Sequence, residues 1–160
     1  MKTLVLGLGN PILSDDGVGI RVAQEVRKQL NNPRVTVAET SEAGLRLLDS
    51  IVGYDEVVII DAIQTKRGKA GQIYRMKPED FSFAEHLSSP HQINLATALE
   101  LGKKLNLTMP QQITVFAVEA NDVSNFGEKC TPEVEKAIPE AVKMVLAELN
   151  AKHLPDGPCY

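Results

Sequence analysis

The sequence predicts an α/β fold in which a twisted, mostly parallel sheet lies between helices on both faces. Short apolar runs, typical of strands buried on both sides, alternate along the chain with longer amphipathic stretches. The 160 residues match the size of one domain, and 43% hydrophobic and 24% charged residues are ordinary for a globular protein. We therefore expect residues 1–150 to form a single domain.

The first half of the chain supplies three strands and two helices to this fold. Residues 3–8 form the first expected strand, which ends at a Gly-Asn-Pro turn. Residues 16–30 carry apolar side chains at i, i+4 spacing, which indicates a helix with one buried face. Residues 34–39 and 56–61 are the next strands, and the second is apolar enough to lie centrally. A short helix over residues 45–51 separates these two strands.

The second half of the chain departs from this regular alternation. A basic, glycine-containing turn leads into residues 72–77, which alternate like a strand. We expect this strand to run antiparallel to its neighbour. A helix over residues 92–105 and a strand over residues 111–119 then resume the pattern.

The last predicted element is a helix over residues 132–149. Thr131 is expected at its N-cap and Pro132 at its first helical position, where proline is well tolerated. Pro139 lies inside the helical pattern and is expected to kink or split it. Residues 151–160 contain two prolines and a glycine without periodicity, and we expect a flexible tail there.

Charge and cysteine content exclude several classes of partner. The net charge of −4 disfavours a nucleic acid or an anionic membrane surface, because both require a basic face. Cys130 and Cys159 stand in unrelated contexts, so neither a disulfide framework nor a CxxC metal site is expected. No signal peptide or membrane-spanning run is evident, and we expect a cytoplasmic protein.

Polar residues that follow the strands suggest a metal site. In open α/β sheets, ligands bind beyond the carboxyl ends of the parallel strands. Asp16 follows the first strand, Asp61 ends the third, and His91 precedes a helix whose start is expected at the same edge. Two carboxylates and an imidazole, without a thiolate, suit Zn, Ni, Mn or Fe.

Each of these residues also has a purely structural interpretation. Asp15 and Asp16 stand at a helix start, where acidic residues commonly cap or oppose the helix dipole. Asp61 suits a turn after a strand, and His91 suits a solvated loop. Asn10 suits a left-handed turn.

Other kinds of chemistry have weak support. The GLGN turn lacks the third glycine of a dinucleotide fingerprint, since Ile12 stands in its place. Ser88, Ser89 and His91 do not form a nucleophile elbow. Cys130 has no evident base partner and is expected to be an inert structural cysteine.

Six sequence segments closely resemble those of the hydrogenase maturation endopeptidases. The longest is GLGNPILSDDGVG at residues 7–19, and the others are TSEAGLRLLD, VVIIDAI, SPHQINL, FAVEANDV and CTPEV. The resemblance extends from the first strand to about residue 149. It implies a five-stranded sheet and an endopeptidase that removes the C-terminal extension of a nickel–iron hydrogenase large-subunit precursor. The SPHQINL form looks most like enzymes that serve coenzyme-reducing hydrogenases.

The same resemblance implies roles for individual residues. Asp16, Asp61 and His91 fall on the family's metal-contacting and catalytic positions, with either Asp61 or Asp16 as general base. Asn10, Thr40 and Gly44 are assigned to substrate binding. The metal is nickel, supplied by the substrate precursor after nickel insertion, and Zn or Cd can substitute in vitro. The precursor is the expected partner, and the enzyme is expected to act as a monomer.

Three alternatives remain at this point. A nickel-sensing binding module without proteolysis would use the same residues. A nucleotide-binding domain would be stabilised by ATP or NAD. Peptidyl-tRNA hydrolases also begin with a strand that ends in GLGNP, but their catalytic histidine would fall where this chain has DGVGIR at residues 16–21. The acidic composition also suits tRNA poorly.

Overall fold

A computed structural model describes residues 1–42, 45–83 and 90–152. It contains one five-stranded sheet with the order β2-β1-β3-β5-β4. The strands are β1 (Thr3–Leu8), β2 (Val35–Thr40), β3 (Glu56–Ile63), β4 (Ile73–Met76) and β5 (Gln112–Glu119). All neighbouring strands are parallel except β4, which is antiparallel to β5. The predicted mostly parallel sheet and its single antiparallel strand are therefore confirmed.

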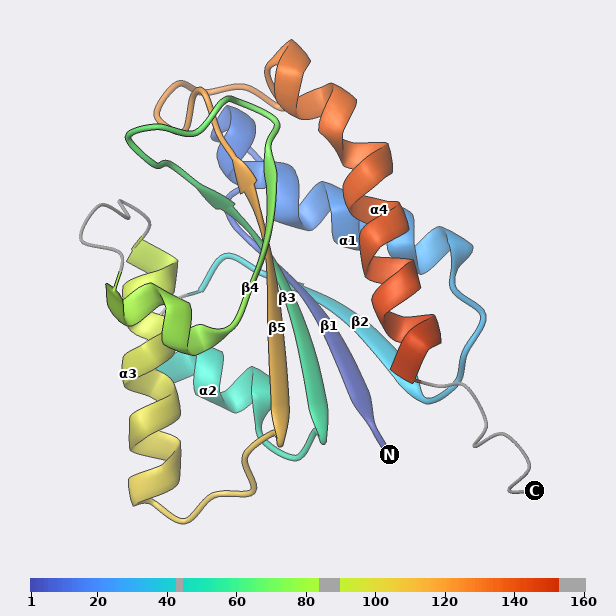
Figure 1. Cartoon of the computed structure of the whole chain (residues 1–160), viewed down its shortest axis with the longest axis vertical. Coiled ribbons are helices and arrows are strands. Elements are labelled where there is room, and N and C mark those ends of the chain that lie inside the picture. The colour runs from blue at the N-terminus through green and yellow to red at the C-terminus, as the bar shows by residue number, and fades with distance from the viewer. Residues whose placement is uncertain (43–44, 84–89, 153–160) are drawn as a thin grey trace.

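Helices cover both faces of this sheet (Figure 1). The α-helices are α1 (Val18–Gln29), α2 (Leu45–Ile51), α3 (Pro90–Lys104) and α4 (Pro132–Lys152), and two short 3₁₀ segments are η1 (Ser14–Gly17) and η2 (Pro78–Phe83). Helices α1 and α4 pack together on one face, and α2 and α3 lie on the other. Among the described residues, no helix is both long and apolar enough to cross a membrane.

The alternation of side chains along the strands builds a core on each face. Val5 and Val58 lie in the core beneath α1 and α4, whereas Leu4, Leu6 and Ile59 lie in the core beneath α2 and α3. Each of these side chains is almost completely buried. Burying one such side chain is worth about 1.5–3 kcal/mol, so the two layers together hold the central strands in place.

The first helix begins later than predicted. The structure places Asp16 in η1, and α1 starts only at Val18. Gly19 lets the helix approach the sheet closely, because a Cβ there would lie 2.3 Å from the carbonyl oxygen of Ile60 and 2.4 Å from that of Leu8. The first turn of α1 therefore rests directly on the ends of β1 and β3. This contact fixes where the preceding acidic turn lies.

The last helix is longer than predicted and is not split. Helix α4 continues past Pro139 to Lys152, two residues into the predicted tail. Pro139 is exposed, while the opposite side of the helix packs into the core through Val142 and Val145. Tertiary packing therefore outweighs the hydrogen bond that proline removes. The Lys152 ammonium lies 3.1 Å from a carboxylate oxygen of Glu148. The remainder of the predicted tail, residues 153–160, lies outside the described part.

Candidate functional site

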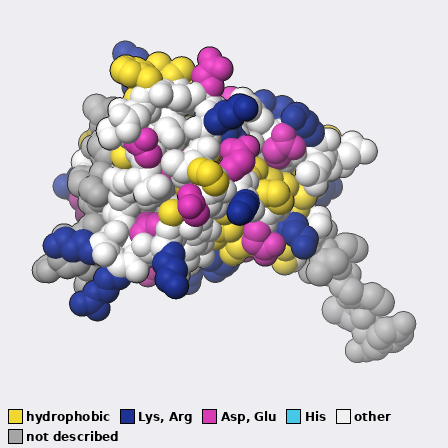
Figure 2. Space-filling view, turned by 90° about the horizontal axis from the view of Figure 1, so that it is seen from above, with side chains coloured by type: hydrophobic (Ala, Val, Ile, Leu, Met, Phe, Trp, Pro, Cys, Tyr) yellow, Lys and Arg dark blue, Asp and Glu magenta, His cyan; other side chains and the backbone are white. Residues whose placement is uncertain are grey.

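The carboxyl ends of β1, β3 and β5 meet at one end of the molecule. In the register of the sheet, Gly7 of β1 pairs with Ile60 of β3, and Asp61 of β3 pairs with Ala117 of β5. The residues that follow these strands therefore gather at the upper end in Figure 1, where open α/β sheets bind their ligands. Figure 2 looks onto this end and shows acidic, basic and hydrophobic side chains interspersed over its surface.

A tight turn after β1 orients Asp16. The backbone N–H of Asn10 donates a 2.8 Å hydrogen bond to Oδ2 of Asp16. Gly9 precedes this turn with φ of +141°, and a Cβ there would lie 1.9 Å from the carbonyl oxygen of Asp16. Only glycine fits this position without displacing the acidic turn. The Asn10 side chain closes the turn by accepting from the N–H of Ile12 at 3.2 Å.

Asp15 has a different task from its neighbour Asp16. Its side chain is fully buried and accepts hydrogen bonds from the backbone N–H groups of Asn121 (2.9 Å), Asp122 (3.0 Å) and Thr131 (2.6 Å). The Thr131 hydroxyl also donates to Asp15, at 2.8 Å. Asp15 therefore ties the turn after β1 to the segment between β5 and α4. The sequence prediction assigned Asp16 to the site and gave Asp15 only the structural interpretation of helix capping, which did not indicate that Asp15 is buried and joins these two segments.

Asp61 is a buried carboxylate with an unused oxygen. It is 1% exposed, and its Oδ1 accepts a 2.8 Å hydrogen bond from the N–H of Ala62. Its Oδ2 is buried and has no hydrogen-bond partner among the described residues. Burial raises the pKa of Asp61 well above its ordinary value, the Ala62 hydrogen bond opposes this rise, and the negative charge of Asp16 adds to it.

Asp16 and Asp61 are therefore close enough for their negative charges to repel each other. A cation between them would relieve this repulsion and would satisfy the unused oxygen of Asp61. Carboxylate oxygens bind Zn, Ni, Mn and Fe. The described side chains, which do not include that of His91, contain no cluster of three or more His, Cys, Asp or Glu that could hold a metal. Metal binding by Asp16 and Asp61 therefore stays a prediction from the sequence.

The other predicted site residues are described to different extents. His91 lies in the first turn of α3, but its side chain is outside the described part, as is Gly44. Thr40 ends β2, and its carbonyl oxygen accepts a 3.2 Å hydrogen bond from the N–H of Gly9. The structure therefore brings Thr40 next to the turn that carries Asn10 and Asp16.

Glu119 secures the segment that follows Asp61. This side chain is 2% exposed, and it accepts hydrogen bonds from both the backbone N–H (3.1 Å) and the hydroxyl of Thr65. The Thr65 hydroxyl oxygen accepts in turn from the N–H of Gly68 at 2.9 Å. Glu119 is the last residue of the strand predicted over residues 111–119, and its sequence position did not indicate this anchoring role.

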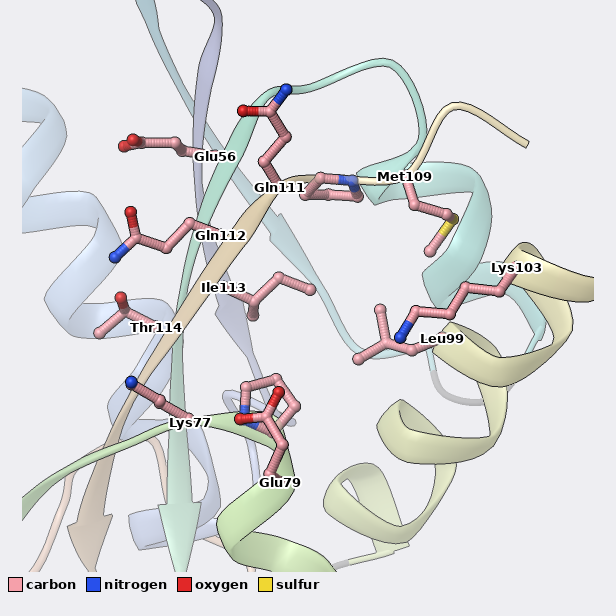
Figure 3. Close-up of a pocket in the computed structure, with 12 residues that line it drawn as sticks. Glu56, Lys77, Glu79, Leu99, Lys103, Met109, Gln111, Gln112, Ile113 and Thr114 are labelled. Carbon is pink, nitrogen blue, oxygen red and sulfur yellow. The ribbon is translucent and has the colours of Figure 1, made fainter. Parts of the chain in front are cut away.

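A cavity of about 690 Å³ lies at the opposite end of the sheet (Figure 3). Its walls include the amino-terminal part of β5 and the last turn of α3, and its charged groups are Glu56, Lys77, Glu79 and Lys103. Neither Asp16 nor Asp61 lines it. The chemistry of the buried carboxylates therefore belongs to the carboxyl-terminal edge and not to this hollow.

Solved structures share this architecture. The hydrogenase maturating endopeptidase HybD from Escherichia coli superimposes with a TM-score of 0.83 at 29% identity, covering 96% of this chain and 94% of that one. The [NiFe] hydrogenase maturation protease HybD from Thermococcus kodakarensis gives a TM-score of 0.69 at 24% identity, covering 92% and 99%. The second comparison supports the fold alone.

Sequence comparisons point the same way. The hydrogenase 2 maturation protease of Escherichia coli (strain K12) is 30% identical over 153 residues, covering 94% of this chain and 92% of its own length. The hydrogenase expression/formation protein HupD of Thiocapsa roseopersicina is 25% identical over 92% of this chain and 67% of its own length. The HycI family model, described as hydrogenase maturation protease, matches residues 20–148. The chain therefore belongs to the hydrogenase maturation protease family and is a hydrolase.

Proposed function

We propose that this protein removes the C-terminal extension from the large-subunit precursor of a nickel–iron hydrogenase after nickel has been inserted. The relatives' names supply the class of substrate, and the observation that carries the proposal is the unpartnered Oδ2 of Asp61 beside Asp16. A buried acceptor without a donor is costly unless a bound ligand supplies its partner. Nickel carried by the precursor is such a partner.

In this proposal, nickel is part of the substrate and not a resident cofactor. Asp16, Asp61 and His91 would complete its coordination, so a nickel-free precursor would dock poorly and keep its extension. Zn or Cd bound in vitro would occupy the same ligands. Nickel would supply Lewis acidity at the scissile carbonyl.

The carboxylates would move the proton. Asp61 or Asp16 would take a proton from the attacking water, whose oxygen then bonds to the scissile carbonyl carbon. The same proton would pass to the nitrogen of the departing extension as the C–N bond breaks.

The remaining expectations belong to the same proposal. Asn10, Thr40 and Gly44 would contact the precursor chain around the scissile bond. We expect the enzyme to act on its precursor as a monomer in the cytoplasm. A coenzyme-reducing hydrogenase is the client that the sequence resemblance favours.

Intact mass spectrometry of a large-subunit precursor incubated with the protein tests this proposal. Nickel-loaded precursor should yield a shortened subunit and a free C-terminal peptide, whereas nickel-free precursor should remain whole. Asp16→Asn, Asp61→Asn and His91→Ala should each abolish or greatly slow cleavage. Asp55→Asn is the matched control, because Asp55 is a carboxylate that contacts the backbone N–H of Lys2 at the opposite end of the sheet. Equal cleavage with and without nickel, or full activity in all three variants, would contradict the proposal.

A further inference from the structure

Two large apolar side chains are exposed on neighbouring loops at the site. Phe126 is 84% exposed and Ile12 is 50% exposed. Ile12 belongs to the turn after β1, and Phe126 belongs to the segment between β5 and α4. Single exposed hydrophobic residues are common on protein surfaces and need no explanation. Their placement together on two loops that meet is the informative feature.

Backbone hydrogen bonds join these two loops directly. The N–H of Gly127 donates to the carbonyl oxygen of Ile12 at 2.9 Å, and the N–H of Ser14 donates to the carbonyl oxygen of Gly127 at 2.9 Å. Leu13 and Gly127 form a parallel bridge, so Ile12 and Phe126 are neighbours in the same register. The two side chains thus form one small apolar feature, which we call the Ile12–Phe126 patch.

The loop that carries Phe126 is held in a defined conformation. The Asp122 carboxylate accepts hydrogen bonds from the N–H groups of Ser124 (3.1 Å) and Asn125 (3.0 Å) and from the Asn125 side chain (2.9 Å). The Asp122 N–H is itself bound to the buried Asp15. An aromatic side chain presented on such a fixed loop loses little conformational entropy when a partner covers it.

The patch is connected to the acidic site through a short chain of contacts. The N–H of Ile12 donates to Oδ1 of Asn10, and the N–H of Asn10 donates to Oδ2 of Asp16. Asp16 and the Ile12–Phe126 patch therefore belong to one hydrogen-bonded turn at the same edge of the sheet. This continuity indicates that the patch and the site serve the same partner.

We propose that the Ile12–Phe126 patch is the docking site for an apolar surface of the precursor protein next to its metal centre. This inference rests on the proposed function and identifies a contact that positions the precursor over Asp16 and Asp61. Aromatic residues that become fully buried dominate the energetics of protein interfaces. Covering Phe126 and Ile12 would therefore contribute to precursor affinity and not to the hydrolytic step.

Cleavage kinetics of the nickel-loaded precursor test this inference. Phe126→Ala and the double variant with Ile12→Ala should raise KM by about tenfold or more, as loss of an aromatic anchor does at interfaces, with kcat unchanged. Leu105→Ala is the control, because Leu105 is 58% exposed but follows α3 at the opposite end of the sheet, and its KM should stay within about twofold of wild type. Phe126→Leu should restore part of the affinity.

The outcomes separate this inference from the function on which it rests. Absence of cleavage by the wild-type protein would contradict the proposed function itself. Normal cleavage with an unchanged KM in Phe126→Ala would overturn the docking site alone. A fall in kcat without a change in KM, in a variant that melts like wild type, would assign Phe126 to the hydrolytic step and not to docking, and would also overturn it. Sedimentation that shows a wild-type dimer, dissociated by Phe126→Ala, would assign the patch to a second copy instead.

Discussion

Replacing Asp61 with asparagine should stabilise the isolated protein while it abolishes processing. The carboxylate is 1% exposed, its Oδ2 has no partner among the described residues, and Asp16 repels it. Leaving one buried polar group unsatisfied costs about 1–3 kcal/mol. Since one pKa unit corresponds to about 1.4 kcal/mol, a shift upward from 3.8 can cost at most about 4 kcal/mol at pH 7. Asparagine removes the buried charge but keeps a polar amide at the same position, so only the cost of the charge is recovered. We therefore expect Asp61→Asn to raise the free energy of unfolding by about 1–3 kcal/mol at pH 7.

The pH dependence of this gain identifies its cause. Burial raises the folded-state pKa of Asp61, so the folded protein holds this proton more tightly than the unfolded chain does. Asp61 therefore lowers wild-type stability as the pH rises above about 4, until the pH exceeds the folded-state pKa. Asparagine does not titrate, so the difference between variant and wild type should shrink towards zero as the pH falls to about 4.

Urea unfolding followed by far-ultraviolet circular dichroism at a series of pH values measures this difference; the chain has no tryptophan for fluorescence. Asp55→Asn, at an exposed position, should show no comparable gain. If Asp61→Asn is no more stable than wild type at pH 7, or if its gain is the same at every pH, the reasoning is wrong. In that case another group already neutralises Asp61 in the isolated protein.

Three further predictions follow from the same site. Asp15→Ala should lower the free energy of unfolding by about 3 kcal/mol or more, because three backbone N–H groups lose a buried acceptor. Urea unfolding measures this loss, and a loss below about 1 kcal/mol would refute the prediction. Gly9→Ala should abolish precursor cleavage, measured by intact mass, since its Cβ would overlap the carbonyl of Asp16, and wild-type activity would contradict that geometry. Burial raises the pKa of the Cys130 thiol to about 11. In a Cys159→Ser background, a thiol reagent at pH 8 should therefore label Cys130 only as the protein unfolds. Rapid labelling of the folded protein would contradict this prediction.

Most of the fold could be predicted because its signals are local. The apolar run at residues 56–61 is too short for a helix and too continuous for a half-exposed strand, and it became the central strand β3. The end of α4 could not be predicted in the same way. Pro139 is a strong local signal for interruption, but burial of Val142 and Val145 against the sheet depends on tertiary structure.

The site was predictable only in its outline. The rule that ligands gather at the carboxyl ends of parallel strands placed Asp16 and Asp61 at one edge, and the structure has them close enough to repel each other, while their role as ligands stays a prediction. It could not assign tasks to Asp15 and Asp16, because the direction of each side chain depends on how Gly9 and Gly19 let the turn lie against the strands. His91 and Gly44 remain predictions from the sequence resemblance.

The distribution of hydrogen bonds among the aspartates explains how one edge of the sheet can be both rigid and able to bind a ligand. Asp15 accepts four hydrogen bonds from segments far along the chain, which fixes the turn and the loop that presents Phe126. Asp61 accepts one, from its own neighbour, and keeps a buried oxygen unused. Satisfied groups hold a structure together, whereas an unsatisfied buried acceptor stores free energy that a bound cation can release. Under the proposed function, a nickel-loaded precursor would recover the free energy that the buried charge of Asp61 costs the isolated protein, and a nickel-free precursor would not.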